Sequence, residues 1–135
     1  MKKLILLVSF IFSNFNFAQI NSELINKTIK ENQNTANFDS ISKILGYKGG
    51  DIVRVSTMFI VTKTGEIDSI VAKGPHSIFE NEAIRLIKKI PPLNPAVVND
   101  TQISQRFALP INFVIETEKQ RKKRIKRELK ALKNK

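Results

Sequence analysis

The strongest alternation of hydrophobic and polar positions lies between Ile103 and Ile115. Apolar residues there fall on one side of an extended chain and polar or small residues on the other, which predicts a strand with one buried face. The apolar side holds Ile103, Phe107, Leu109, Ile111, Phe113 and Ile115, opposite Ser104, Arg106, Ala108 and Asn112. Because Pro110 cannot donate a ladder hydrogen bond, we expect this strand at a sheet edge or at a bulge. An exposed edge is a candidate docking site.

A second alternating segment, residues 52–61, predicts another half-buried strand. Its apolar side holds Val53, Val55, Phe59 and Val61, opposite Arg54, Ser56 and Thr62. Residues 63–66 then contain a glycine suited to a turn, and residues 67–73 resume extended character. The two segments therefore predict an antiparallel hairpin.

The segment from Ser77 to Ile90 has helical spacing. Its apolar stripe is Phe79, Ala83, Leu86, Ile87 and Ile90, and Glu82, Arg85, Lys88 and Lys89 are expected to face solvent. Ser77 precedes Glu80 by the spacing of a capping box, in which each side chain accepts a hydrogen bond from a backbone N–H of the other residue. Pro91 and Pro92 end the helix. We expect it to pack across the hairpin.

The first residues predict export. Lysines at positions 2 and 3 precede an apolar run from Leu4 to Phe12, and Ala18 is a small residue suited to cleavage. The run covers about half of the ~20 residues that a membrane-spanning helix needs. Residues 1–18 therefore indicate a cleavable signal peptide rather than a retained anchor, and the mature protein is expected in the periplasm.

Two short helices are predicted between this segment and the first strand. Apolar residues recur with helical spacing in residues 20–29 and again in residues 38–45. The three glycines within residues 46–50 predict a flexible joint before the strand.

Positive charge is concentrated at the end of the chain. From Thr117 to Lys135 there are ten Lys or Arg and two Glu, a net charge of +8 out of +11 for the whole chain. Ile125, Leu129 and Leu132 recur there with helical spacing, which predicts a basic helix with a thin apolar stripe. Such a helix is either a solvated tail or a surface that binds an anionic partner. The candidate anion-binding residues are Arg121, Lys122, Lys123, Arg124, Lys126 and Arg127.

Side chains that support catalysis or cofactor binding are scarce. The chain has no Cys and a single His, His76, so no metal or nucleophile site is predicted. Ser40–Lys43 and Lys63–Gly65 match two signatures of penicillin-binding enzymes, but the third signature is missing and the predicted domain is too small for that active site. We expect neither an enzyme nor a cofactor.

The block from Val53 to Ile115 resembles the carboxy-terminal domain of TonB, the energy transducer of Gram-negative outer-membrane transport. The matching motifs, in order, are the hairpin at Val55–Asp68, the helix start at Phe79–Arg85, the proline-spaced Ile90–Ala96 and the strand at Leu109–Phe113. Two positions depart from the family pattern: Leu93 stands where Trp is usual, and Asn99–Thr101 replaces a common Asn-Gly turn.

The resemblance implies an α+β fold built on a small β-β-α-β domain, to which the patterns above add short amino-terminal helices and a basic carboxy-terminal helix. It also implies that a receptor peptide adds as a strand beside the last strand of the domain. The partner-binding residues would be Ile103, Gln105, Phe107, Leu109, Ile111 and Phe113. The expected divisions are a signal peptide (1–18), helices and linker (19–50), the TonB-like domain (51–116) and the basic tail (117–135).

Three functions follow from these expectations. The leading hypothesis is a periplasmic module that binds an envelope protein, such as a TonB-dependent outer-membrane receptor, by strand addition. The second is a shortened energy transducer whose first segment stays in the membrane. The third is an exported protein that binds anionic envelope surfaces, such as a membrane, through its tail. A homodimer formed through the last strands is left open, and nucleic acid is not an expected partner.

Overall fold

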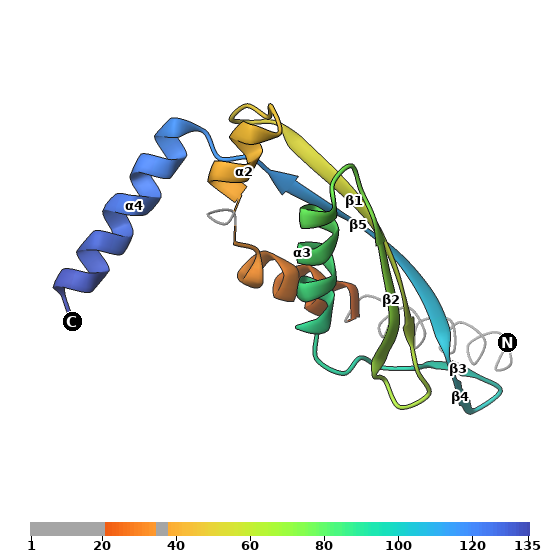
Figure 1. Ribbon diagram of the computed structural model, residues 1–135. Coiled ribbons are helices and arrows are strands. Elements are labelled where there is room, and N and C mark those ends of the chain that lie inside the picture. The colour runs from red at the N-terminus through yellow and green to blue at the C-terminus, as the bar shows by residue number, and fades with distance from the viewer. Residues whose placement is uncertain (1–20, 35–37) are drawn as a thin grey trace, which may run out of the picture.

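A three-stranded antiparallel sheet lies at the centre of the fold (Figure 1). The computed structural model describes residues 21–34 and 38–135. Its elements are an amino-terminal helix (residues 21–32), α2 (Asp39–Ile44), β1 (Ile52–Val61), β2 (Ile67–Lys73), α3 (Ser77–Lys88), β3 (Ala96–Val98), β4 (Thr101–Ile103), β5 (Gln105–Val114) and α4 (Glu118–Lys133). The strand order is β2-β1-β5. The predicted α+β class and the β-β-α-β order are confirmed.

The core lies between the sheet and the helices on one of its faces. β1 turns Val55 and Phe59 inward, as its alternation predicted, and each is at most 1% exposed. Phe79 of α3 packs against Phe113 of β5 and against Phe38, with ring centroids 5.8 and 4.9 Å apart. Burial of each such side chain contributes about 1.5–3 kcal/mol. These aromatic contacts hold α3 and the segment before α2 against the strands.

The two predicted amino-terminal helices are present. The first lies beside α3, where the Arg85 guanidinium donates a hydrogen bond to the Asn32 carbonyl at 2.9 Å. Asn21, its first described residue, forms two reciprocal hydrogen bonds with Asn94. Asn21 Nδ2 donates to the Asn94 carbonyl at 2.9 Å, and the Asn94 N–H donates to Asn21 Oδ1 at 3.1 Å. The predicted signal peptide, residues 1–18, lies outside the described residues.

The predicted last strand is divided in two. Ile103 ends β4, which pairs with β3 in a separate hairpin, and β5 begins at Gln105. The hairpin turns at Asn99 and Asp100, whose φ angles of 49° and 60° suit these residue types. The prediction of one strand from Ile103 to Ile115 was therefore wrong at its beginning. Alternation alone does not show where a chain changes its partner strand.

The start of α3 also corrects two expectations. His76, not Ser77, is the N-cap, and no side chain caps the helix. Glu80 instead accepts a hydrogen bond from the Gly74 N–H at 2.9 Å, which ties α3 to the end of β2. Glu82, predicted to face solvent, is 9% exposed and accepts two hydrogen bonds from Arg85, at 2.8 and 2.6 Å. This hydrogen bonding raises the pKa of Arg85, so its guanidinium group stays charged.

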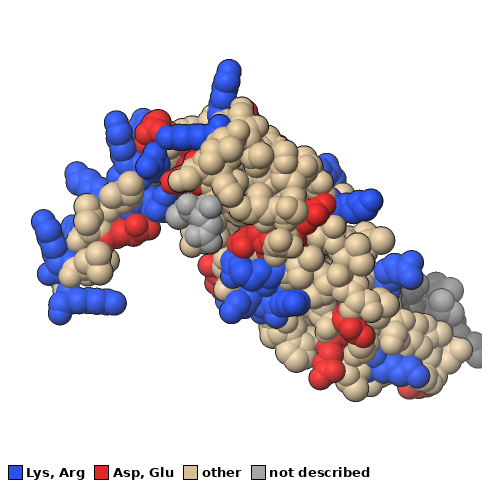
Figure 2. All heavy atoms as spheres, in the orientation of Figure 1, with Lys and Arg blue, Asp and Glu red and all other residues tan. Residues whose placement is uncertain are grey.

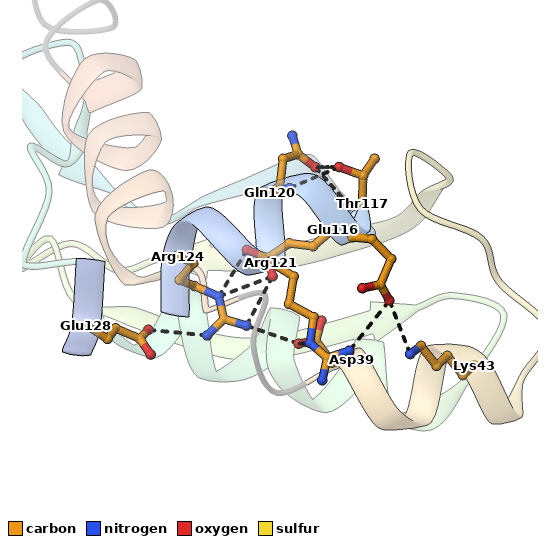
Figure 3. A network of polar contacts seen from close by, with 9 residues as sticks. Asp39, Lys43, Glu116, Thr117, Gln120, Arg121, Arg124 and Glu128 are labelled. Atoms are coloured by element: carbon orange, nitrogen blue, oxygen red, sulfur yellow. Dashed lines mark hydrogen bonds and ion pairs between the residues drawn. The ribbon is translucent and has the colours of Figure 1, made fainter. Parts of the chain in front are cut away.

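The predicted basic helix is α4, and a charged network holds its first turns (Figure 3). Arg124 contacts the carboxylates of Asp39 at 3.0 Å, Glu116 at 3.1 Å and Glu128 at 3.2 Å. Arg121 reaches Asp39 at 3.4 Å. Hydrogen bonding to Glu116 is the main cause that raises the pKa of Arg124, which remains a cation throughout the physiological range. We call Asp39, Glu116, Arg121 and Arg124 the clamp.

A capping box begins the same helix. The Gln120 N–H donates to Thr117 Oγ1 at 3.3 Å, and the Thr117 N–H donates to Gln120 Oε1 at 2.9 Å. A cap of this kind contributes about 1 kcal/mol. Together with the clamp, it fixes the direction in which α4 leaves the sheet.

The turn between β1 and β2 requires glycine at position 65. Gly65 has a φ of +86°, and a Cβ there would overlap the Leu93 carbonyl oxygen, beside the hydrogen bond from the Leu93 N–H to the Gly65 carbonyl (2.8 Å). Gly65→Ala should lower the free energy of unfolding about 1–3 kcal/mol more than Gly46→Ala. Gly46 is the matched control because its φ is +83° and nothing lies within 4 Å of its Cβ position. Urea denaturation measures both, and equal losses would contradict the overlap.

The clamp predicts a local change when Arg124 is neutralised. Arg124→Gln should speed amide hydrogen exchange in the first turns of α4 about fivefold, since a networked, partly exposed ion pair contributes about 1 kcal/mol. Arg127→Gln removes the same charge from the same helix and leaves every ion pair of the clamp in place. Equal exchange in the two variants would show that the clamp does not hold α4.

Candidate functional site

One edge of the sheet is formed by β5. This strand pairs with β1 along its whole length, from Val114 opposite Ile52 to Gln105 opposite Val61. Within the described part of the chain, no strand pairs with the other side of β5. The edge position predicted from Pro110 is therefore confirmed.

Successive residues of β5 direct their backbone groups alternately toward β1 and away from it. The Asn112 carbonyl accepts a hydrogen bond from Gln33 Nε2 at 3.0 Å, and Gln33 lies outside the sheet. The Leu109 carbonyl faces β1, where Thr57 Oγ1 donates to it at 2.6 Å. The backbone N–H and C=O groups of the even-numbered residues of β5 therefore point toward the free edge. Pro110 belongs to this outward set, so its missing N–H is lost from the free edge and not from the ladder with β1.

A groove of about 330 Å³ lies beside the first half of β5, between this strand and the amino-terminal helix. Phe107 and Leu109 of β5 and Ile25 of the helix supply its apolar lining. The Phe107 ring stacks on Phe59 of β1, with centroids 5.8 Å apart, which restricts its movement. A strand paired with the outward backbone groups next to this groove would place alternate side chains against an apolar surface.

The six predicted partner-binding residues do not form one surface. Ile103 lies in β4 rather than in β5. Ile111 and Phe113 are only 3% and 0% exposed, so their side chains belong to the core and are not available to a partner. The residues that do line the groove are Gln105, Phe107 and Leu109. The predicted alternation is correct, and the β5 members of the set lie on one face of the strand. That face is turned toward the core, and a partner can reach it only along the first half of the strand.

Part of the groove comes from residues that the sequence analysis did not single out. The amino-terminal helix contributes Asn21, Ser22, Ile25 and Asn26, and Asn94 joins them from the segment after α3. Helical spacing predicted the helix, but it carries no information about the part of the sheet beside which the helix lies. The paired Asn21 and Asn94 are a long-range contact that no local motif reveals.

The six predicted anion-binding residues also fall into two groups. Arg121 and Arg124 are engaged in the clamp. The others form no ion pair with any described residue: they are Lys122, Lys123, Lys126 and Arg127. Figure 2 shows Lys and Arg side chains projecting along α4. The set of cations open to an anionic partner is therefore smaller than predicted. Two of its members, Lys123 and Arg127, border the same hollow as Glu116 and Arg124 of the clamp.

Residues 21–34 and 38–135 contain no group of three or more His, Cys, Asp or Glu placed to hold a metal ion. Nor does any helix in these ranges have the length and apolar character needed to cross a bilayer. The His76 ring packs edge-on against Tyr47, with ring centroids 5.8 Å apart, so it takes part in packing. The edge of β5 and the free face of α4 are thus the two candidate sites.

Comparison with known families identifies the domain that carries the edge. Residues 50–115 match the family model of the Gram-negative bacterial TonB protein C-terminal. A search of curated proteins found no match. Domains of the matched family lie in the periplasm, are non-catalytic and interact with envelope proteins such as outer-membrane receptors. The matched range contains all three strands of the sheet together with α3, and this domain of the chain belongs to the TonB carboxy-terminal domain family.

Proposed function

We propose that this protein is a periplasmic TonB-like module that binds an outer-membrane receptor or another envelope protein by accepting one of its segments as an added strand on β5. The observation that carries the proposal is the free edge of β5 next to an apolar groove. Backbone groups on such an edge bind any extended segment, and the groove favours segments with suitable side chains. Affinity and selectivity thus have separate sources.

The geometry limits where the segment docks. Arg106 and Ala108 direct their N–H groups outward, and Pro110 has none to offer. Farther along, Gln33 already donates to the outward carbonyl of Asn112 at 3.0 Å. The docking strand is therefore expected to pair with residues 105–109, where the groove also lies.

The same edge discourages pairing with a second copy. Pro110 interrupts its row of donors, and Arg106 places a charge on it. Proline and charged residues on edge strands are common devices against edge-to-edge association. We therefore favour an envelope protein over a homodimer as the occupant, and the oligomeric state is measured alongside binding.

Export is part of the proposal, with residues 1–18 as a signal peptide. The mature amino terminus should lie at or close to Gln19, and sequencing of the purified periplasmic protein measures it. An intact Met1 recovered in the membrane fraction would instead support an anchored energy transducer, because such a protein needs its first segment in the membrane.

Ala108→Pro tests the docking edge. The substitution removes an outward N–H and leaves a carbonyl of the added strand unpaired, a loss of about 1–3 kcal/mol. Binding of peptides from the periplasm-facing segments of outer-membrane receptors should weaken about 5- to 150-fold. Isothermal titration calorimetry measures the dissociation constant.

Ala108→Val is the matched control, since it changes the same side chain and keeps the N–H. It should bind like the wild type, and thermal unfolding should show that both variants are folded. Unchanged binding by a folded Ala108→Pro variant would reject strand addition at this edge. A wild-type dimer that dissociates in that variant would assign the edge to a second copy.

A further inference from the structure

The clamp leaves one side of α4 open. Arg121 and Arg124 turn toward Asp39 and Glu116 on the body of the protein (Figure 3). The apolar stripe of α4 lies outside these contacts, and its members are increasingly exposed toward the end of the helix. The exposed fractions are 39% for Ile125, 55% for Leu129 and 67% for Leu132. No described residue covers this stripe.

A row of lysines borders the stripe. Lys122, Lys126, Lys130 and Lys133 follow one another at helical spacing on one side of it. With Ile125 and Leu129 they line a shallow hollow of about 480 Å³. We call this surface of four lysines and the stripe the lysine face. Its lysine stems extend the apolar area, while their ammonium groups lie at its margin.

Acidic side chains do not neutralise the lysine face. The two acids of α4 are Glu118 and Glu128, and both are already paired. Glu118 contacts Lys43 at 3.5 Å and Arg121 at 3.6 Å, and Glu128 contacts Arg124 at 3.2 Å. Glu118 lies at the first turn of the helix, four residues before Lys122, but it is shared between Lys43 and Arg121. No described acid pairs with a lysine of the lysine face, so that face carries an excess of positive charge.

We propose that α4 lies flat on the surface of an anionic phospholipid bilayer. Its apolar stripe would lie at the boundary between the headgroups and the acyl chains, and its lysines would contact the phosphates. A thin apolar stripe bordered by lysines is the pattern of an interfacial helix rather than of a spanning one. Sixteen residues give α4 a length of about 24 Å, enough to contact several headgroups. Because the clamp joins α4 to the rest of the protein, it would set the orientation of the sheet relative to the membrane.

Charge argues against a second copy of the chain as the occupant. Two stripes packed together would bring two lysine rows side by side, and neither helix has an unpaired acid to offset them. An acidic protein would also satisfy the lysines, but the hollow along the stripe is shallow and is lined by residues of α4 alone. A flat anionic surface fits the open hollow and the graded exposure better.

Co-sedimentation of the full chain with vesicles tests the proposal. Binding is expected to vesicles of phosphatidylcholine with a minority of phosphatidylglycerol, and to fall steeply with added salt. Vesicles of phosphatidylcholine alone report any contribution that does not depend on lipid charge. The test variant replaces three lysines of the lysine face by glutamine: Lys122→Gln, Lys126→Gln and Lys130→Gln.

Each lysine near an anionic surface changes partitioning about fivefold, so the test variant should lose about 100-fold. The matched control removes three charges from outside the lysine face, with Lys123→Gln, Arg127→Gln and Lys135→Gln, and should lose about tenfold or less because the first two side chains lie on another side of α4 and the third follows its end. Leu129→Gln should weaken binding without changing its salt dependence, since it removes only apolar contact.

Three results would overturn the proposal. The first is no charge-dependent binding to the anionic vesicles. The second is an equal loss in the two triple variants, which would indicate attraction by net charge and not by one face. The third is a stable dimer in solution that Leu129→Gln dissociates, which would assign the stripe to a second copy. None of these results bears on peptide binding by Ala108→Pro, so the two proposals fail separately.

Discussion

The pairing of β1 with β5 is the interaction on which the rest of the structure depends. It joins segments about 50 residues apart in a ladder that runs the full length of both strands. The ladder continues beyond the strands, because the Gly50 N–H donates to the Ile115 carbonyl at 2.8 Å and the Ile115 N–H donates to the Asp51 carbonyl at 2.9 Å. A Cβ on Gly49 would lie 2.7 Å from the Thr117 Cα. The same pairing therefore leaves one edge of β5 free. It also places Thr117, the N-cap of α4, against the loop before β1.

Local sequence patterns predicted most elements of the fold, and they failed where residues far apart compete for the same group. Ser77 and Glu80 have the spacing of a capping box, as do Thr117 and Gln120, but only the second pair forms one. The difference is that the Gly74 N–H lies within reach of Glu80. Spacing shows that two side chains can meet, whereas the folded chain decides which partner is nearer.

The site was predicted less completely for a related reason. Leu109 and Ile111 are equivalent in the alternating pattern, yet Leu109 lines the groove and Ile111 is buried in the core. The amino-terminal helix and the segment around Asn94 make this difference, and their positions depend on long-range contacts. In the same way, Arg124 and Arg127 are both basic residues of one helix. Only Arg124 faces Asp39, which is distant in the sequence.

The two proposed surfaces lie at opposite ends of one strand and depend on different forces. β5 has ten residues, so the groove at its start and α4 beyond its end are about 30 Å apart. This separation exceeds the Debye length of about 8 Å at physiological ionic strength, so lysines on α4 do not act electrostatically on a peptide at the groove. Hydrogen bonds of an added strand join neutral groups and respond little to salt, whereas the lysine face is screened. Membrane contact would therefore act on receptor binding by concentrating the module at a surface, which raises the effective concentration of the docking edge without changing its intrinsic affinity.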